Sequence, residues 1–274
     1  MQQKTAIGVF DSGYGGLTVL KEIVKLLPQY NFIYLGDNAR APYGNHSFDT
    51  VYRNTLQCSK WFFEKNCPLL VLACNTASAK ALRSIQQNDL PKIDDKKRVL
   101  GVIRPTTEKI GNYSTSKHIG ILATNGTVAS GSYPIEIEKF FPDVKVFQQA
   151  CPLWVPLVEN NELHSVATDF LVKKYIDQLL NQSASIDVIL LACTHYPLLF
   201  DKIRVHTPAH IQILSQGEIV ANGLADYLLR HPELESQCGK NGERWFYTTD
   251  SSFDFDKQAR LFYGEEVAST PICL

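Results

Sequence analysis

Short apolar runs alternate with amphipathic stretches along most of the chain. Between the apolar runs, residues 17–27, 166–180 and 218–229 have the spacing of amphipathic helices, and Pro28 ends the first of them. Strands that alternate with helices are typical of parallel sheets, so the pattern predicts an α/β fold. The runs that we expect to form strands are residues 6–10, 32–35, 69–73, 99–103, 118–123, 144–147, 188–192 and 211–214.

The two halves of the chain resemble each other in three places. The matches come in the same order, at offsets of 112, 113 and 119 residues. We therefore expect a duplicated unit: two similar parallel-sheet α/β domains related by pseudo-symmetry, with the active site in the cleft between them. The matching pairs are residues 7–13 with 119–126, 31–37 with 144–150, and 70–76 with 190–195.

A charged stretch at residues 91–98 is the expected junction between the two units. The tail from about residue 211 has no counterpart between the units and carries an aromatic run at Trp245. We expect it to pack back on the first unit. The predicted domains are therefore residues 1–98 plus 211–274, and residues 99–210.

Composition and charge exclude several classes of protein. Of 274 residues, 45% are hydrophobic and 20% are charged, which is typical of a globular protein. The net charge of −1 offers no general field for nucleic acid, so an anion must be bound by local donors. The polar start and the short apolar run after it do not resemble a signal peptide, and no run of 18 apolar residues predicts a membrane span.

The cysteines predict a reducing compartment. There are seven of them, an odd number, and none forms a Cys-x-x-Cys pair, which disfavours a disulfide framework and a zinc ribbon. We expect a cytoplasmic protein. Among the seven histidines, no helical pair has metal-ligand spacing, so we expect no metal site.

Polar side chains follow the ends of the predicted strands, where ligands gather in parallel sheets. Asp11 and Ser12 follow the first strand, Asp37 the second, and Thr124 the strand that repeats the first. The glycines after Asp11 suggest a dinucleotide site, but that motif requires glycine at position 18, where this chain has Thr18. They form either a plain tight turn or a turn that brings N–H groups and the Ser12 hydroxyl to a carboxylate.

Cys74 and Cys193 follow equivalent strands of the two units. A single cysteine there is most often a small core residue, but two at matching positions indicate chemistry. A helix amino terminus lowers the pKa of a thiol, and a base with a pKa near the working pH can exchange a proton in either direction. Two thiols that face each other across a cleft could flank one carbon, as inversion by proton transfer requires.

Two further side chains have open interpretations. His195 lies two residues after Cys193. Its side chain either contacts the substrate, contacts the Cys193 thiol, or has a structural role. Asp11 caps a helix, holds the substrate ammonium, or orients Cys74.

Six motifs in the chain resemble those of glutamate racemase, in that family's order and spacing. The resemblance runs from about residue 7 to residue 262. It implies a cofactor-independent cytoplasmic enzyme, expected to be a homodimer, that interconverts L-glutamate and D-glutamate and supplies D-glutamate for peptidoglycan. The motifs are FDSGYGG (10–16), GD (36–37), APYG (41–44), LACNT (72–76), CPLWVPLVE (151–159) and LACTHYP (191–197).

The resemblance also implies roles for individual residues. Cys74 is the base for D-glutamate, supported by Asp11, and Cys193 is the base for L-glutamate, supported by His195 and its partner Glu159. Asp37 corresponds to a carboxylate near the site. The family has bulkier residues than the Asn-Gly at 125–126. The implied substrate contacts are Asp11, Ser12, Pro42, Tyr43, Gly44, Asn75, Thr76, Thr124, Thr127 and Thr194.

Three other functions compete with this hypothesis. In a cysteine hydrolase or transferase, Cys193 would attack a carbonyl with help from His195. An aspartate racemase would use the same chemistry on a shorter substrate. A noncatalytic amino-acid-binding protein would bind without changing optical rotation.

Overall fold

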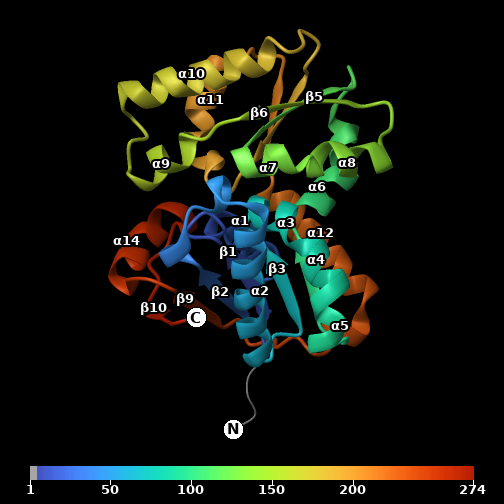
Figure 1. Cartoon of the computed structure of the whole chain (residues 1–274), viewed down its shortest axis with the longest axis vertical. Helices are drawn as coiled ribbons and strands as arrows, with labels where there is room; N and C mark the ends of the chain where they lie inside the picture. Colours follow the sequence, from blue (N-terminus) through green and yellow to red (C-terminus); the bar gives the residue numbers. More distant parts are fainter. Residues whose placement is uncertain (1–4) are drawn as a thin grey trace.

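A computed structural model describes residues 5–274 as two parallel sheets, one above the other in Figure 1. The polar start of the chain, where we expect no signal peptide, and the first residues of the predicted domain 1–98 lie largely outside this range. All pairings of the first sheet are parallel. Its strands, in spatial order, are β10 (Ser269–Pro271), β9 (Arg244–Thr248), β2 (Phe32–Gly36), β1 (Ile7–Asp11), β3 (Leu69–Leu72) and β4 (Arg98–Gly101).

The second sheet repeats the strand order of the first. The order β6-β5-β7-β8 corresponds to β2-β1-β3-β4, and all its pairings are parallel. The predicted α/β fold with two similar parallel sheets is thus confirmed, and each of the eight predicted strands is present. The strands of the second sheet are β6 (Lys145–Ala150), β5 (His118–Ala123), β7 (Val188–Ala192) and β8 (Gln212–Ser215).

Helices cover both faces of the first sheet. Because successive strand residues point to opposite faces, Val9 lies in the core with α1, α12 and α14, while Phe10 lies in the core with α2. Helix α1 ends just before Pro28, as predicted. These helices and the short ones between β3 and β4 are α1 (Leu17–Leu26), α2 (Phe48–Glu64), α3 (Asn75–Lys80), α4 (Leu82–Ser84), α5 (Leu90–Ile93), α12 (Gly217–Arg230), α13 (Pro232–Glu235) and α14 (Ser252–Tyr263).

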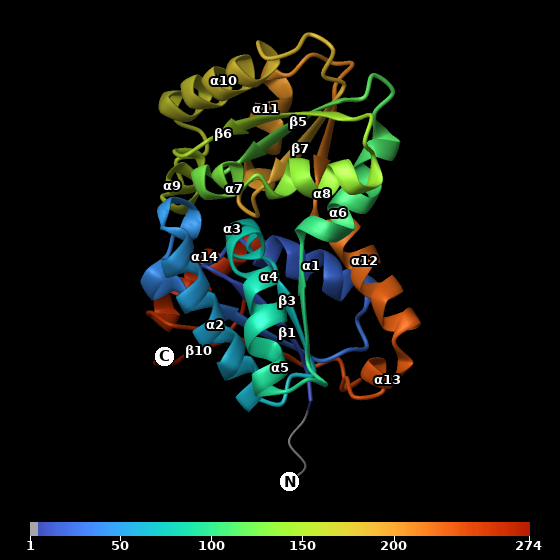
Figure 2. The ribbon, with the colours of Figure 1, turned by 45° about the vertical axis from the view of Figure 1, so that its right-hand side comes forward.

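The second sheet is covered in the same way. Leu191 shares a core with α9, α10 and α11, and Leu190 shares a core with α6 and α8. Helix α7 lies against α3 of the first domain, and Figure 2 shows these two helices between the sheets. The helices of this domain are α6 (Ile103–Ile110), α7 (Asn125–Ser130), α8 (Ser132–Phe140), α9 (Trp154–Glu159), α10 (Val166–Leu180) and α11 (Phe200–His206).

The chain changes sheet twice. Strand β4 pairs with β3 in the first sheet, and the chain then enters the second domain through α6. Strand β8 pairs with β7 in the second sheet, and the chain then returns through α12. Both changes lie a few residues after the predicted boundaries at 98 and 210. The charged stretch at 91–98 leads into β4 and is therefore a connection inside the first domain.

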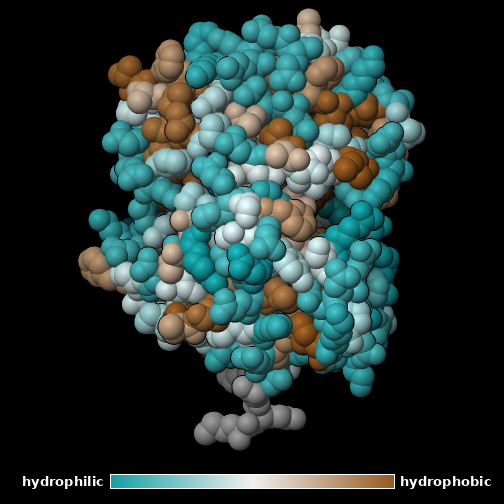
Figure 3. Space-filling model, in the orientation of Figure 1, coloured by the Kyte–Doolittle hydropathy of each residue, from teal (hydrophilic) through white to brown (hydrophobic). Residues whose placement is uncertain are grey.

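The surface in Figure 3 is mostly hydrophilic, with apolar residues in small separate groups. Among the described residues, no helix is long and apolar enough to cross a membrane.

Candidate active site

A small cavity of about 30 Å³ lies between the two domains. It contains both cysteines that the sequence singles out, together with His195 and eight of the expected substrate contacts. The lining residues are Ser12, Pro42, Tyr43, Gly44, Asn45, Cys74, Asn75, Thr76, Thr124, Pro152, Val155, Pro156, Cys193, Thr194 and His195.

Cys74 lies where β3 gives way to α3 and is the N-cap of that helix. The Ala77 amide donates to its Sγ at 3.4 Å, and Ser12 Oγ lies 3.6 Å from the same sulfur. Burial and, after it, the Asp11 carboxylate raise the pKa of the Cys74 thiol to about 12, although these two contacts act to lower it. The expectation that the helix terminus brings this pKa toward neutrality is therefore wrong for Cys74, because burial outweighs the amide of Ala77.

Asp11 is fully buried behind the cavity. Its Oδ1 accepts from the Gly13 amide at 3.0 Å, and its Oδ2 accepts from the Thr194 hydroxyl of the other domain at 3.4 Å. Burial raises the pKa of Asp11, while a charged His195 opposes that rise. The N-cap of α1 is Gly16, so the alternative in which Asp11 caps this helix is wrong.

Cys193 follows β7 and lies beside an imidazole. Its Sγ is 4.0 Å from His195 Nδ1, and Nε2 of the same ring is 2.8 Å from Glu159 Oε1 on α9. Burial opposes a charge on His195, but the bonds with Cys193 and Glu159 raise its pKa to about 10. The expected pairing of His195 with Glu159 is thus present, and the ring favours its protonated form.

Helix α14 of the first domain contacts both His195 and Glu159. The Gln258 side chain donates to the backbone oxygen of Glu159 at 2.9 Å. The Phe262 ring packs edge-on against His195, with centroids 5.2 Å apart. The sequence offers no signal for these two contacts, which depend on the tail reaching the other domain.

Asp37 lies outside the cavity and holds the loop that lines it. Its buried carboxylate accepts from Arg40 Nε at 2.7 Å, from the Thr249 hydroxyl at 2.9 Å, and from the hydroxyl of Tyr43. Tyr43 and Gly44 then reach the cavity. Asp37 therefore fixes the position of this wall.

Three threonines join the domains across the cavity. Thr76 Oγ1 lies 2.9 Å from Thr124 Oγ1 and 3.4 Å from Thr127 Oγ1, and the latter two are 3.1 Å apart. Thr127 lies behind Thr124 rather than on the cavity wall. Gly126 permits this approach, because a Cβ there would lie 2.9 Å from the Gly44 carbonyl oxygen. The bulkier residue expected in this family would not fit without a shift.

Four wall residues were missed by the sequence analysis as individual contacts: Asn45, Pro152, Val155 and Pro156. The last three lie within the CPLWVPLVE motif, and Asn45 follows APYG directly. The motifs therefore indicated all four: three by their place inside CPLWVPLVE, and Asn45 as the next residue after APYG.

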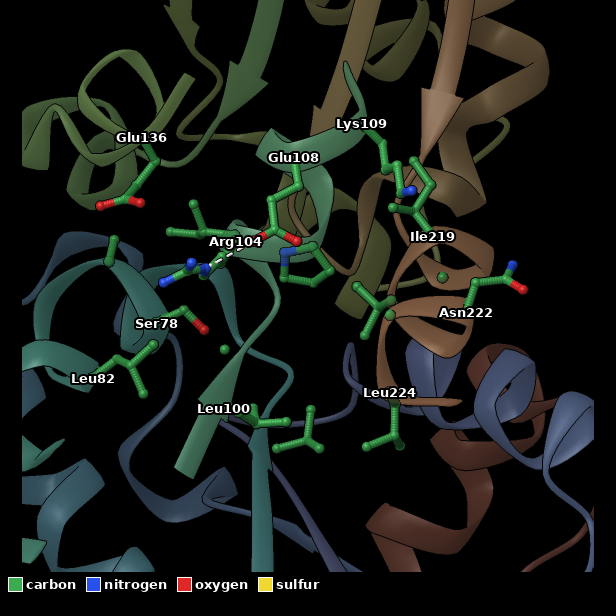
Figure 4. Close-up of a pocket in the computed structure, with 18 of the residues that line it drawn as sticks. Ser78, Leu82, Leu100, Arg104, Glu108, Lys109, Glu136, Ile219, Asn222 and Leu224 are labelled. Carbon is green, nitrogen blue, oxygen red and sulfur yellow. Dashed lines mark hydrogen bonds and ion pairs between the residues drawn. The ribbon is translucent and has the colours of Figure 1, made fainter. Parts of the chain in front are cut away.

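A second, larger groove of about 1970 Å³ opens elsewhere at the junction of the domains. Figure 4 shows Arg104 and Glu108 of α6 among its walls, with their ion pair of 2.8 Å, and Asn222 and Leu224 from α12. Among the described residues that line this groove, none is a predicted site residue. The candidate chemistry is therefore confined to the smaller cavity.

Known proteins resemble this chain over nearly its whole length. A glutamate racemase of Persephonella marina is 39% identical over 263 residues, which cover 96% of this chain and 95% of the relative. The crystal structure of glutamate racemase isoform RacE1 from Bacillus anthracis has a TM-score of 0.90 at 30% identity, covering 100% of this chain and 99% of the other.

A glutamate racemase from Francisella tularensis, solved in complex with D-glutamate, has a TM-score of 0.86 at 28% identity, covering 99% of this chain and 98% of the other. The sequence model described as Asp/Glu/Hydantoin racemase matches residues 7–222. The chain therefore belongs to the Asp/Glu/Hydantoin racemase family and, within it, to the glutamate racemases.

Proposed function

We propose that this chain interconverts L-glutamate and D-glutamate without a cofactor, with Cys74 and Cys193 acting on opposite faces of the α-carbon. One observation carries the proposal: the two thiols follow equivalent strands of different domains and line one small cavity. The substrate is supported by the relatives, among them a structure with D-glutamate bound.

Two-base racemisation starts from one thiolate and one thiol, because one sulfur removes a proton while the other donates one. Burial keeps Cys74 protonated at neutral pH through its raised pKa. A protonated His195, 4.0 Å from the Cys193 sulfur, stabilises a thiolate there. A thiol at Cys74 and a thiolate at Cys193 are the forms that the reaction of L-glutamate requires.

In this direction the Cys193 thiolate takes the α-proton of L-glutamate, and the Cys74 thiol donates its proton to the opposite face. The products are D-glutamate, a Cys193 thiol and a Cys74 thiolate, so protons and charge balance. The reverse reaction starts from the Cys74 thiolate, which burial and the Asp11 carboxylate both disfavour. Exchange of protons with solvent restores the resting state.

The α-proton is a very weak acid, so the negative charge that develops toward the carboxylate must be stabilised. Hydroxyl groups of Ser12, Thr76, Thr124 and Thr194 line the cavity and can donate to this charge. The Asn75 amide also lines the cavity and binds the carboxylate in substrate and transition state alike. We propose these groups, with the wall formed by Pro42, Tyr43 and Gly44, as the substrate contacts. Thr127 acts through Thr124.

The domains must separate for glutamate to enter. A cavity of about 30 Å³ has room for about two water molecules, too few for glutamate to replace without a movement of the walls. Once glutamate fills the closed cavity, little space is left for water, and the low access of water strengthens hydrogen bonds to the developing charge.

Proton NMR in heavy water tests the proposal. With L-glutamate, the wild-type protein should place solvent deuterium at Cα and produce D-glutamate. Cys74→Ser and Cys193→Ser should each lower turnover by at least about 1000-fold, because each removes a base. The exposed Cys273 provides the control, since Cys273→Ser should remain fully active.

Other outcomes would identify a different function. Near-native turnover in either serine variant would refute the two-base assignment. A trapped acyl-thioester without deuterium would support a cysteine hydrolase, and binding without either product would support an amino-acid-binding protein. Faster turnover of aspartate than of glutamate would make the chain an aspartate racemase.

The resemblance also supports a cellular role. We propose that the D-glutamate serves peptidoglycan synthesis, that the protein works in the cytoplasm, and that it is a homodimer. The seven cysteines are free thiols, in keeping with a reducing compartment. Sedimentation velocity tests the homodimer, which a purely monomeric boundary would refute.

A further inference from the structure

Three buried side chains close a ring of hydrogen bonds behind the active site. The Asn75 Nδ2 group donates to Gln216 Oε1 at 2.7 Å. Gln216 Nε2 donates to the Tyr133 hydroxyl at 2.7 Å, and that hydroxyl donates to Asn75 Oδ1 at 2.6 Å. Each side chain therefore donates once and accepts once around the ring.

The ring joins segments that are far apart in the sequence. Asn75 follows Cys74 at the start of α3, Tyr133 lies on α8 of the second domain, and Gln216 is the N-cap of α12, where the chain returns to the first domain. All three are nearly inaccessible to solvent, at 2%, 0% and 4% exposure. A buried polar group that loses its partner is destabilising, so the ring resists rearrangement.

A fourth residue determines the direction of the ring. The Thr106 hydroxyl donates to the Val102 carbonyl oxygen at 2.9 Å, so its oxygen is free to accept, and it accepts from Gln216 Nε2 at 3.0 Å. Gln216 must therefore present its NH₂ group to Thr106 and Tyr133, and its oxygen to Asn75. Asn75 in turn must present its NH₂ group to Gln216 and its oxygen to Tyr133.

This orientation matters because Asn75 also lines the active-site cavity. One N–H of its amide is used by Gln216, and the second N–H remains as a donor. If the amide were reversed, an oxygen would take the place of this donor and repel a carboxylate.

We propose that Gln216 is a positioning residue, which orients the Asn75 amide so that an N–H and not an oxygen is offered to the substrate carboxylate. The inference rests on the proposed function, because it assumes that glutamate occupies the cavity. Gln216 itself does not line that cavity and acts through Asn75 alone.

Kinetics of Gln216→Met test this role. Methionine has a similar length but no amide, so the Asn75 amide loses its fixed direction. We expect the KM for glutamate to rise about tenfold, with kcat within about twofold of wild type, because the contact binds substrate and transition state alike. The enantiomers have equal free energy in water, so kcat/KM must fall equally in both directions.

A double-mutant cycle separates positioning from a general structural effect. If Gln216 acts through Asn75, then Gln216→Met should raise KM no further in an Asn75→Ala background. Tyr133→Phe keeps Gln216 and the shape of the ring but removes the donor to Asn75 Oδ1. This variant should raise KM about threefold, and it tests the proposal if Gln216→Met fails to fold.

The control lies on the same helix, in the larger groove. Asn222 is exposed there, and its side chain donates to the Glu218 backbone oxygen within α12 (Figure 4). Asn222→Ala should therefore leave KM and kcat unchanged.

The results distinguish this inference from the proposed function. Unchanged KM in folded Gln216→Met or Tyr133→Phe, or an equal loss with and without Asn75, would overturn the positioning role while racemisation stands. A wild-type protein that places no deuterium at Cα of glutamate would overturn the proposed function and this inference with it.

Discussion

Replacing Glu159 with glutamine tests whether a carboxylate keeps His195 protonated beside Cys193. Glu159 Oε1 lies 2.8 Å from His195 Nε2, and the two side chains are 22% and 5% exposed. Glutamine preserves the size and the hydrogen bond but removes the charge. The protonated ring then loses its partner, and the Cys193 thiolate loses part of its stabilisation.

The size of the change in the pKa of His195 follows from the hydrogen bond that Glu159 makes to it. A hydrogen bond to a charged group contributes about 1.5–3 kcal/mol, and one pKa unit corresponds to about 1.4 kcal/mol. The substitution should therefore lower the raised pKa of His195 by about 1–2 units, and partial exposure of Glu159 places the change near the lower value.

The direction of the pH effect follows from the protonation state of His195 in the active protein. Protonated His195 supports the thiolate, so activity falls as the pH rises through the pKa of this ring. A lower pKa moves the alkaline limb of the pH profile to lower pH by about one unit. Circular dichroism of glutamate, recorded from about pH 6 to about pH 11, gives kcat/KM across the whole alkaline limb.

The control is Glu162→Gln, an exposed carboxylate three residues further along the chain. Its profile should match the wild type. An unshifted alkaline limb in Glu159→Gln, with the protein folded, would show that the carboxylate does not control the charge of His195.

Two other substitutions probe the walls of the site. Gly15→Ala would put a Cβ 2.2 Å from Thr194 Oγ1 and 2.5 Å from His195 Nδ1; we expect kcat/KM to fall at least about 100-fold, and activity within about threefold of wild type would contradict this close approach. Tyr43→Phe removes the hydroxyl that donates to Asp37; a loss of about 1 kcal/mol should lower the melting temperature by about 2–4 °C in calorimetry. An unchanged melting temperature would mean that this bond adds no net stability.

The fold is largely predictable because its signals are local. The eight strands found from the sequence are rich in apolar residues, and those in the middle of the sheets, such as β1, β3 and β7, are buried throughout. Strand β10 was missed because Ser269–Pro271 is a short edge strand with mostly exposed side chains. Strand β9 was noted only as an aromatic run, since half-buried residues from Arg244 onward lack a clear alternation.

The site was less predictable because its electrostatics depend on tertiary burial. The position of Cys74 at a helix start follows from the sequence, but the desolvation that raises its pKa depends on both domains closing over it. The sequence does contain a signal for Gln216: it lies two positions after the predicted strand at 211–214, close to a strand end like Cys74 and Cys193. Its partners Tyr133 and Thr106 could not be inferred, because helices α6 and α8 bring them there.

A crystal structure with bound glutamate measures the central claim most directly. We predict that the sulfur atoms of Cys74 and Cys193 lie on opposite sides of the same α-carbon, each within about 3–3.5 Å of the atom with which it exchanges a proton. Both sulfurs on one side, or one of them out of reach of that carbon, would contradict the mechanism.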